Sequence, residues 1–349
     1  MRLEPRETTP AWLGVMAPVA AVVVTLFLSS GLIVWAGAPV GAAYASLVRG
    51  ALGSVFALSE TLTRATPLIL TGLAVAVAFR AKLWNIGGEG QLYAGAMAVT
   101  WLGTGAFTLP PYLMIPTLFV IGAIAGGILL LIPTILKVRL QVDEVVTTLL
   151  LNFVVLLFAN WLLFGMWKDP LAMGWPQAAP VVDEGTLPLL VAKTRLHAGF
   201  VIAVAVAVLV WALMRFTRWG FEIRAVGLNP EASRFAGLPM NRVILRTALI
   251  SGGLAGLAGV TEVAGLKGYL TLDISPGFGY TGIAVAMLAG LHPLGVIASA
   301  IFIAAIYNGA DAMSRAMSIS NYLADVITAT ALLCVLASML FTRYRLRRG

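Results

Sequence analysis

A short run of polar and flexible residues interrupts the apolar sequence in the first third of the chain. This run, AKLWNIGGEGQLYAGA, covers residues 81 to 96 and carries Asn85, Glu89 and Gln91 beside Gly87, Gly88 and Gly90. Irregular backbone inside a membrane is stable only where protein or a water-filled cavity satisfies its polar groups. The run is therefore a candidate wall or gate of a pathway. The alternative is a tight turn whose Asn and Gln cap two helices and whose Glu89 faces a helix dipole.

Two acidic residues lie inside otherwise apolar stretches. Glu262 is expected near the outer end of one membrane span, and Asp325 near the outer end of the last one. Proton-coupled transporters place ionisable residues near the middle of the membrane, so neither position favours such coupling. Glu262 is a candidate pathway residue or, alternatively, a salt-bridge partner of Lys267. Asp325 fits an acid in the first turn of its helix, with a transport role as the alternative.

The residue patterns of common enzymes and metal sites do not occur in the sequence. It contains no G-x-x-x-x-G-K-[ST] phosphate loop, no H-E-x-x-H run and no histidine pair at metal-ligand spacing. His197 and His292 are expected at opposite membrane faces as surface or turn residues. The single cysteine, Cys334, lies in an apolar run and gives no disulfide framework. We therefore expect no catalytic residue, no metal site and no cofactor bound by this chain.

A capped segment lies between two apolar stretches in the second half of the chain. It reads GLNPEASRFAGL and covers residues 227 to 238. Asn229 can accept a hydrogen bond from the first helical turn, Pro230 suits the first helical position, and Glu231 faces the positive end of the dipole. Gly237 supplies a left-handed stop. The helix is far too short to span a membrane, so a partner docks on it or it lies on the lipid headgroups.

The composition predicts an all-α polytopic membrane protein. The chain has 349 residues, of which 60% are hydrophobic and 11% charged, and its mean hydropathy is +0.95. The formal charge of +8 records orientation across the bilayer, because most basic residues fall on the side that holds both ends and the capped segment. We expect both termini in the cytoplasm, membrane lipid around one transmembrane domain over residues 1 to 349, and no nucleic-acid partner.

About ten transmembrane helices are expected. The first apolar run, residues 12 to 35, exceeds the core of about 7 to 15 residues that a cleaved signal peptide has. Residues 36 to 62 are amphipathic and are expected at the outer surface. The predicted spans cover about 12–35, 63–80, a third ending near Phe107, 113–136, 145–163, 198–214, 243–266, a short helix and a longer one split at His292-Pro293 within 277–308, and 322–341.

Small residues recur where two of these helices are expected to pack closely. Gly252 and Gly256 lie within a run of small residues in the span that follows the capped segment. Gly279 and Gly282 lie at the start of the run that His292-Pro293 interrupts. Small side chains let helix backbones approach each other in membranes. We expect these four glycines at packing or hinge positions.

Four collinear motifs resemble a known family. The segment 227–238 resembles the coupling segment of ABC importer permeases. The chain as a whole resembles the branched-chain amino acid, ribose and nucleoside permease family. The runs LWNIGGEGQLYAGA (residues 83–96), GGLAGLAGVTEVAG (residues 252–265) and GFGYTGIAVAMLAGLHPLG (residues 277–295) are similar to signatures of its nucleoside branch, which is linked to basic membrane proteins.

The resemblance implies a type II ABC importer-like permease in a bacterial cytoplasmic (inner) membrane. Its partners would be an ABC ATPase with two nucleotide-binding domains, which binds ATP and Mg²⁺, a second homologous permease and an extracytoplasmic substrate-binding protein. The segment 227–238 would enter a cleft on the ATPase as a cytoplasmic coupling helix. The coupling residues would then be Gly227, Asn229, Pro230, Glu231, Arg234 and Gly237.

Nucleosides, and next simple sugars, are the substrates that the resemblance implies. Asn85, Glu89 and Gln91 offer donors and acceptors suited to ribose hydroxyls or base edges, and Glu262 could accept from a sugar hydroxyl. Two other classes remain open. One is a stand-alone secondary transporter or facilitator, which would work without an ATPase. The other is a membrane scaffold or enzyme subunit, for which the sequence shows no reactive cluster.

Overall fold

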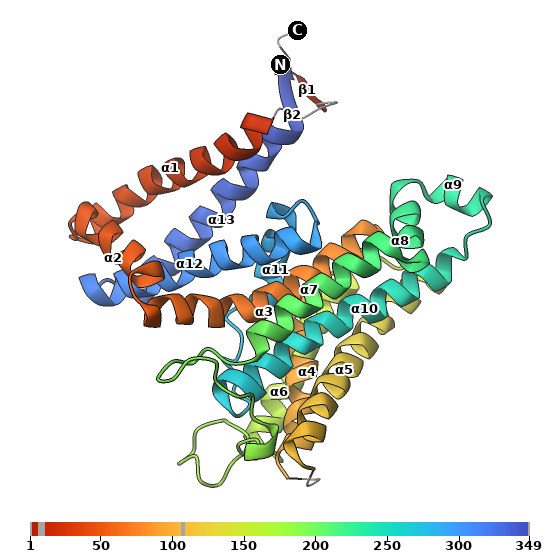
Figure 1. Cartoon of the computed structure of the whole chain (residues 1–349), viewed down its shortest axis with the longest axis horizontal. Coiled ribbons are helices and arrows are strands. Elements are labelled where there is room, and N and C mark those ends of the chain that lie inside the picture. Colours follow the sequence, from red (N-terminus) through yellow and green to blue (C-terminus); the bar gives the residue numbers. More distant parts are fainter. Residues whose placement is uncertain (1, 6–10, 106–108, 348–349) are drawn as a thin grey trace. The chain divides into compact units, whose positions relative to one another are not determined.

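The computed structural model describes residues 2–5, 11–105 and 109–347 and is built almost entirely of helices (Figure 1). Two short strands, β1 Arg2–Pro5 and β2 Tyr344–Arg347, pair antiparallel. The chain divides into two compact units: Met1–Thr61 with Ile301–Gly349, and Leu62–Ala300. The helices are α1 Ala11–Trp35, α2 Val40–Leu52, α3 Val55–Arg80, α4 Gly88–Gly103, α5 Pro111–Leu140, α6 Glu144–Phe164, α7 Gly199–Phe216, α8 Arg218–Leu228, α9 Pro230–Phe235, α10 Met240–Val260, α11 Phe278–Leu288, α12 Pro293–Met317 and α13 Asn321–Arg343, with a 3-10 turn Asp183–Gly185 and a π-helical turn Thr261–Lys267.

The first unit pairs the two ends of the chain, because α1 packs along α13. Its buried cluster is Ile33, Ala43, Met313 and Ile327. A single amide also joins its elements: Asn308 Nδ2 donates to the backbone carbonyls of Gly50 and Ala57 and to Thr61 Oγ1, at 3.0 to 3.1 Å. Apolar side chains and the Asn308 side-chain nitrogen thus hold α2, the start of α3 and α12 together.

The second unit is organised around α10, which packs against α4 and α5. The contact is backbone against backbone, because small residues line it. A Cβ added at Gly256 would lie 2.2 Å from the carbonyl oxygen of Gly122, and one at Gly252 would lie 2.4 Å from that of Gly126. Distances this short leave no room for a larger residue, so the backbones of α5 and α10 pack directly against each other.

Seven helices in the described part of the chain are long and apolar enough to cross a membrane, or eight if the bent pair of α1 and α2 counts as one span. The expected number of about ten is not confirmed. Two of the expected spans are short, because α4 has 16 residues and α11 has 11, whereas a full span needs about 20. The predicted end of the third span at Phe107 lies outside the described residues.

Two predicted boundaries are wrong. The second span was expected to begin near residue 63, but its helix α3 begins at Val55, directly after α2. The charges of Arg49 and Glu60 interrupt the apolar run without breaking the helices. The helix expected to end near Asn308 continues to Met317. The predicted break at His292-Pro293 is present, between α11 and α12.

Candidate functional site

The irregular segment between α3 and α4 is held by side chains of α6. Asn152, fully buried, donates to the carbonyl of Ile86 at 3.0 Å and accepts the N–H of Gly90 at 2.8 Å. Thr148 Oγ1 accepts the N–H of Ile86 at 3.3 Å. Protein groups therefore satisfy the backbone of this segment. Sequence analysis missed Asn152 and Thr148; the one available signal was an amide and a hydroxyl inside an otherwise apolar run.

The amides of Asn85 and Gln91 bond to each other. Asn85 Nδ2 donates to Gln91 Oε1 at 2.9 Å, and Gln91 Nε2 donates back to Asn85 Oδ1 at 2.8 Å. Asn85 also donates to Ser251 Oγ of α10 at 3.0 Å, and Ser251 donates to the carbonyl of Ala74 in α3 at 2.7 Å. Both amides are 1% exposed. The geometry favours a structural role for this pair, which links α3, α4 and α10.

Glu89 caps a helix other than its own. It lies in the first turn of α4, and its Oε2 accepts the backbone N–H of Gly279 at 2.7 Å, in the first turn of α11. The backbones touch here, because a Cβ on Gly279 would lie 2.1 Å from Glu89 N. The side chain is buried, with the residue 3% exposed. A carboxylate suits this place because the first N–H groups of a helix lack partners and carry partial positive charge.

Arg80 reaches the other end of α11. It is the last residue of α3, and its Nε donates to the carbonyl of Leu291 at 2.9 Å. Leu291 follows Gly290 in the turn between α11 and α12, and both have positive φ, +61° and +58°. A guanidinium at a helix C-terminus complements its partial negative charge. Sequence analysis did not single out Arg80, since nothing local marks its partner.

The predicted caps of the coupling segment are present in α9. Asn229 Oδ1 accepts the N–H of Ala232 at 3.0 Å, and Pro230 occupies the first turn. Gly237 ends the segment with φ +74°. In Figure 1, α8 and α9 project from the end of α10, with α9 at the tip. The segment is thus a rigid short helix held out from the body of its unit.

The outward surface of α9 is larger and more apolar than expected. Glu231 and Arg234 are exposed. Phe235, the last residue of α9, is 97% exposed, and Leu228, the last residue of α8, is 82% exposed. Fully exposed large apolar residues on a short, capped helix mark an interaction surface. Sequence analysis missed Phe235 and Leu228, because the motif alone does not show which of its positions face outward.

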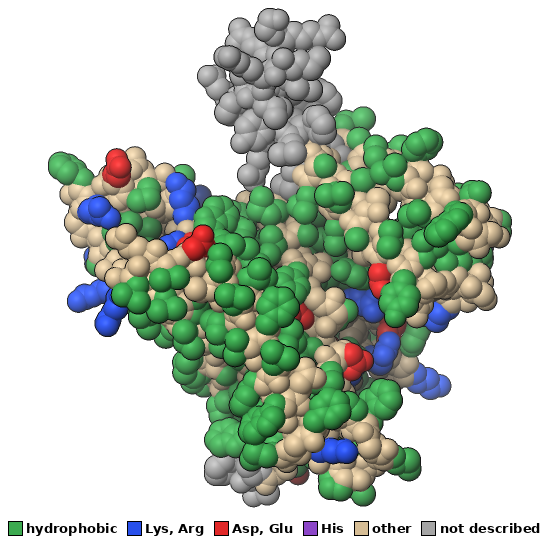
Figure 2. Space-filling model, turned by 180° about the vertical axis from the view of Figure 1, so that it is seen from behind, with side chains coloured by type: hydrophobic (Ala, Val, Ile, Leu, Met, Phe, Trp, Pro, Cys, Tyr) green, Lys and Arg blue, Asp and Glu red, His purple; other side chains and the backbone are tan. Residues whose placement is uncertain are grey.

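A buried carboxylate fastens the base of α8 to α10. Glu222, whose side chain is 4% exposed, accepts from Arg218 Nε at 3.0 Å and from Arg246 Nη2 at 2.9 Å. The guanidinium of Arg246 also lies 5.0 Å from the ring centroid of Trp219. Figure 2 shows Lys and Arg side chains gathered around this end, at upper left, while hydrophobic side chains cover most of the rest of the visible face.

Glu262 lies in the π-helical turn Thr261–Lys267 that continues α10, and it is 2% exposed. Lys267, the salt-bridge partner considered from the sequence, instead pairs with Asp273 at 3.3 Å. Single π-helical turns are rare and often occur at functional sites.

The two histidines differ in environment. His292 is exposed, and its Nδ1 accepts the N–H of Gly295 at 3.3 Å, as a turn residue would. The surface position expected for His197 is wrong: it is 1% exposed and packs on Gly265 of the π-helical turn. Its Nδ1 accepts the N–H of Gly199 at 3.2 Å, whereas Nε2 is buried with no partner among the described residues. Burial lowers the pKa of His197 to about 4.

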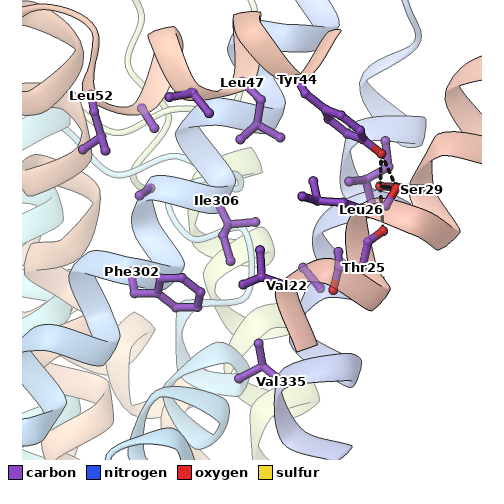
Figure 3. Close-up of a pocket in the computed structure, with 15 residues that line it drawn as sticks. Val22, Thr25, Leu26, Ser29, Tyr44, Leu47, Leu52, Phe302, Ile306 and Val335 are labelled. Carbon is purple, nitrogen blue, oxygen red and sulfur yellow. Dashed lines mark hydrogen bonds between the residues drawn. The ribbon is translucent and has the colours of Figure 1, made fainter. Parts of the chain in front are cut away.

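A cavity of about 250 Å³ in the first unit has apolar walls (Figure 3). Leu26, Leu47, Phe302 and Ile306 line it, with side chains from α1, α2, α12 and α13. The hydroxyls at its edge are already bonded: Thr25 donates to Ala21 O and Ser29 to Thr25 O, and Tyr44 bonds to Ser29 and to Leu26 O. These walls suit hydrocarbon, so this cavity is unfit for a polar solute.

The chain matches a known family along most of its length. Residues 57–336 match the family model described as branched-chain amino acid transport system, permease component. The chain is 36% identical to a glucose ABC transporter permease of Haloferax volcanii, over 100% of this chain and 95% of the relative. It is 35% identical to a guanosine ABC transporter permease of Bacillus subtilis, over 93% of each. It is 32% identical to a nucleoside ABC transporter permease of Lactococcus lactis, over 86% of this chain and 85% of the relative.

A solved structure has a similar fold. The fold resembles that of PsaBC from Streptococcus pneumoniae, with a TM-score of 0.50 and 13% identity, over 85% of this chain and 95% of that one. At this identity the likeness concerns the fold alone. The sequence relatives add the role of a permease, a subunit that is not itself an enzyme and that works with an ATPase and a substrate-binding protein. The chain therefore belongs to the family of permease components of branched-chain amino acid transport systems and is an all-α, multi-pass membrane subunit of an ABC transporter.

Proposed function

We propose that this chain forms half of an import pathway for nucleosides or simple sugars and that α9 couples it to the ATPase. The observation that carries the proposal is the capped, outward-facing α9 with Phe235 at 97% exposure. The substrate class rests on relatives named as guanosine, nucleoside and glucose permeases. Nucleosides come first, because the motif of residues 83–96 resembles the nucleoside branch.

Docking would bring α9 into a groove on the ATPase. The exposed Phe235 and Leu228 would fill an apolar pocket, and Glu231 and Arg234 would make polar contacts around it. ATP and Mg²⁺ would bind to the partner, an ATPase with two nucleotide-binding domains, and not to this chain. A few kcal/mol of differential contact between two states is enough to invert a two-state equilibrium.

The proposed arrangement in the membrane follows from this docking. The side with α9 would be the cytoplasm, and the arginines around α8 and α9 support that side by the positive-inside rule. Both termini would lie there too, in the cytoplasmic (inner) membrane of a bacterium. A second, related permease would complete the pathway, and an extracytoplasmic binding protein would deliver the solute.

The four pathway candidates are unequal in the structure. Asn85 and Gln91 bond to each other, and Glu89 caps α11, so their polar atoms are engaged by protein. Glu262 is different, since it lies in the π-helical turn that continues α10 and not in a cap or an amide pair. Of the four, we place Glu262 first as a contact for a substrate hydroxyl.

The test is transport by the reconstituted complex. The permeases and the ATPase are purified together and placed in liposomes. ATP is supplied on the side of the membrane that holds the ATPase, and the binding protein with labelled guanosine or glucose is supplied on the other side. Replacing Glu231→Ala and Arg234→Ala together should reduce ATPase association and uptake at least tenfold. Arg139→Gln, at an exposed arginine in the last turn of α5, serves as the control. Normal ATPase association and coupled uptake in the double variant would contradict the docking site, and gradient-driven uptake without an ATPase would contradict the proposal.

A further inference from the structure

The helix α11 is held at both ends by charges from one stretch of chain. Glu89 accepts the N–H of Gly279 at its N-terminal end, and Arg80 donates to the carbonyl of Leu291 just past its C-terminal end. An 11-residue helix is about 16 Å long. Both charges have the sign that complements the dipole of α11. The segment from Arg80 to Glu89, which joins α3 to α4, therefore binds both ends of the short helix α11.

Arg80 also contacts the pair of helices α8 and α9, residues 218–235, which is here called the arm. Gly227, near the C-terminal end of α8, packs so tightly on the main chain of Arg80 that an added Cβ would lie 1.8 Å from the Arg80 carbonyl oxygen. Gly227 is buried in this contact. One residue thus meets the arm through its backbone and α11 through its side chain.

The arm is built to move as a body. Glu222 ties α8 to α10 through Arg246, and the Asn229 cap fixes the bend between α8 and α9. A displacement at α9 is therefore carried to the adjoining C-terminal end of α8, where Gly227 lies, instead of being absorbed in the bend between the two helices. At that end the nearest backbone is that of Arg80 and Ala81.

The turn held by Arg80 is suited to be a hinge. Gly290 and Leu291 both have positive φ, and Pro293 begins α12 directly after them. Leucine adopts the left-handed region at a cost, so the surrounding contacts must hold it there. The hydrogen bond from Arg80 Nε is one such contact.

We propose that Arg80 is the positioning residue that transmits movement of α9 to α11 and to the turn between α11 and α12. The inference rests on the proposed coupling role of α9. When the ATPase displaces α9, Gly227 presses on the backbone of Arg80, and its guanidinium moves the C-terminal end of α11. Because Glu89 holds the other end, α11 changes its tilt and not its length.

The first test uses Arg80→Gln in the reconstituted complex. We expect uptake to fall at least tenfold, while the ATPase stays bound and hydrolyses ATP within twofold of the unchanged complex. Arg80→Lys keeps the charge without the guanidinium geometry and should recover part of the uptake. Arg139→Gln should behave as the unchanged protein. A structural role alone would lower yield or thermal stability without separating uptake from hydrolysis.

Hydrogen exchange of residues 278–292 gives a second readout. In the unchanged complex nucleotide binding should alter the exchange of this segment, and in Arg80→Gln the nucleotide effect should be absent. Wild-type uptake per ATP in Arg80→Gln, or a preserved nucleotide effect, would overturn the inference while leaving α9 as the docking site. If the unchanged permease fails to bind the ATPase, the proposed function falls, and this inference with it.

Gly227→Ala tests the contact between Gly227 and the Arg80 backbone from the α8 side, and it serves as the second variant if Arg80→Gln folds poorly. The added methyl would press on the Arg80 carbonyl, so the ratio of uptake to hydrolysis should fall at least fivefold. Gly41→Ala is the matched control, because an added Cβ there meets nothing within 4 Å. Equal ratios in the two alanine variants would overturn the inference.

Discussion

The side-chain amides of Asn85 and Gln91 exchange two hydrogen bonds, at 2.9 and 2.8 Å, in a part of the protein where both residues are 1% exposed. Each amide supplies the other with one hydrogen-bond donor and one acceptor, so the loss of either side chain removes hydrogen-bond partners from buried polar atoms of the other. The polar run that the sequence presents as a possible pathway wall is, at these two positions, a joint between helices.

Breaking this pair should destabilise the protein before it changes substrate recognition. Gln91→Leu leaves the buried Asn85 amide without one donor and one acceptor, at a cost of about 1 to 3 kcal/mol. We expect a lower thermal midpoint in detergent and, for the folded fraction, an unchanged KM for uptake. The double variant Asn85→Leu/Gln91→Leu should cost less than the sum of the single variants. A raised KM with unchanged thermal stability would instead place these amides in the pathway.

The two ion pairs of Glu222 should contribute very differently to the free energy of unfolding. Glu222→Ala leaves Arg246 without its carboxylate, and breaking a buried pair by removing one partner costs about 3 to 5 kcal/mol; since Arg246 is 31% exposed, the lower end applies. Arg218→Ala is the control, because the Arg218 side chain is 83% exposed and such pairs contribute about 0 to 1 kcal/mol. Thermal unfolding with hydrogen exchange of α8 would measure both. Equal losses in the two variants would refute the role given to Arg246.

Acid should destabilise the protein through His197. The pKa of His197 is about 4 in the folded chain and about 6.5 when exposed, so the unfolded chain binds more protons between these values. Stability is therefore complete above pH 6.5 and falls as the pH drops to 4, by about 3 kcal/mol in all. His197→Asn should flatten this part of the curve of unfolding midpoint against pH, and His292→Asn should not. An unchanged slope in His197→Asn would refute the assignment.

Enlarging a glycine at the contact of α5 and α10 should separate the two helices. Gly256→Ala places a methyl 2.2 Å from the Gly122 carbonyl oxygen, so the backbones must move apart. Overpacking of this kind costs about 1 to 3 kcal/mol. Gly31→Ala, where an added Cβ has open space, should cost nothing measurable. Thermal midpoints of the two variants, compared in the same detergent, would decide, and a fully stable Gly256→Ala would contradict the packing described.

Features that depend on residues close together in the chain could be predicted from the sequence. Asn229, Pro230 and Gly237 act on backbone groups within a few residues, so their order alone predicts the ends of α9. The membrane class followed from composition, and the small residues of α10 lie against α5 in the way that their spacing suggests. These features need no knowledge of distant segments.

Long-range contacts were not readable in the same way. Arg80 meets Leu291, and Asn152 meets Ile86, across large separations in the chain, and no spacing rule connects such partners. The prediction for His197 was wrong for a related reason. Its position in a polar loop suggested an exposed side chain, whereas the ring is buried against Gly265 of the π-helical turn. The expected count of about ten spans is not confirmed, because α4 and α11 are shorter than the roughly 20 residues that a full span needs.

Photo-crosslinking tests most directly whether α9 is the surface that meets the ATPase. A photoreactive phenylalanine analogue replaces Phe235, or Trp161 as a control that is 60% exposed on the α6 span, and the transporter complex is irradiated in membranes. We predict a crosslink from position 235 to the ATPase, altered by ATP, and none from position 161. A crosslink from position 235 to the extracytoplasmic binding protein, or to lipid alone in the assembled complex, would contradict the account.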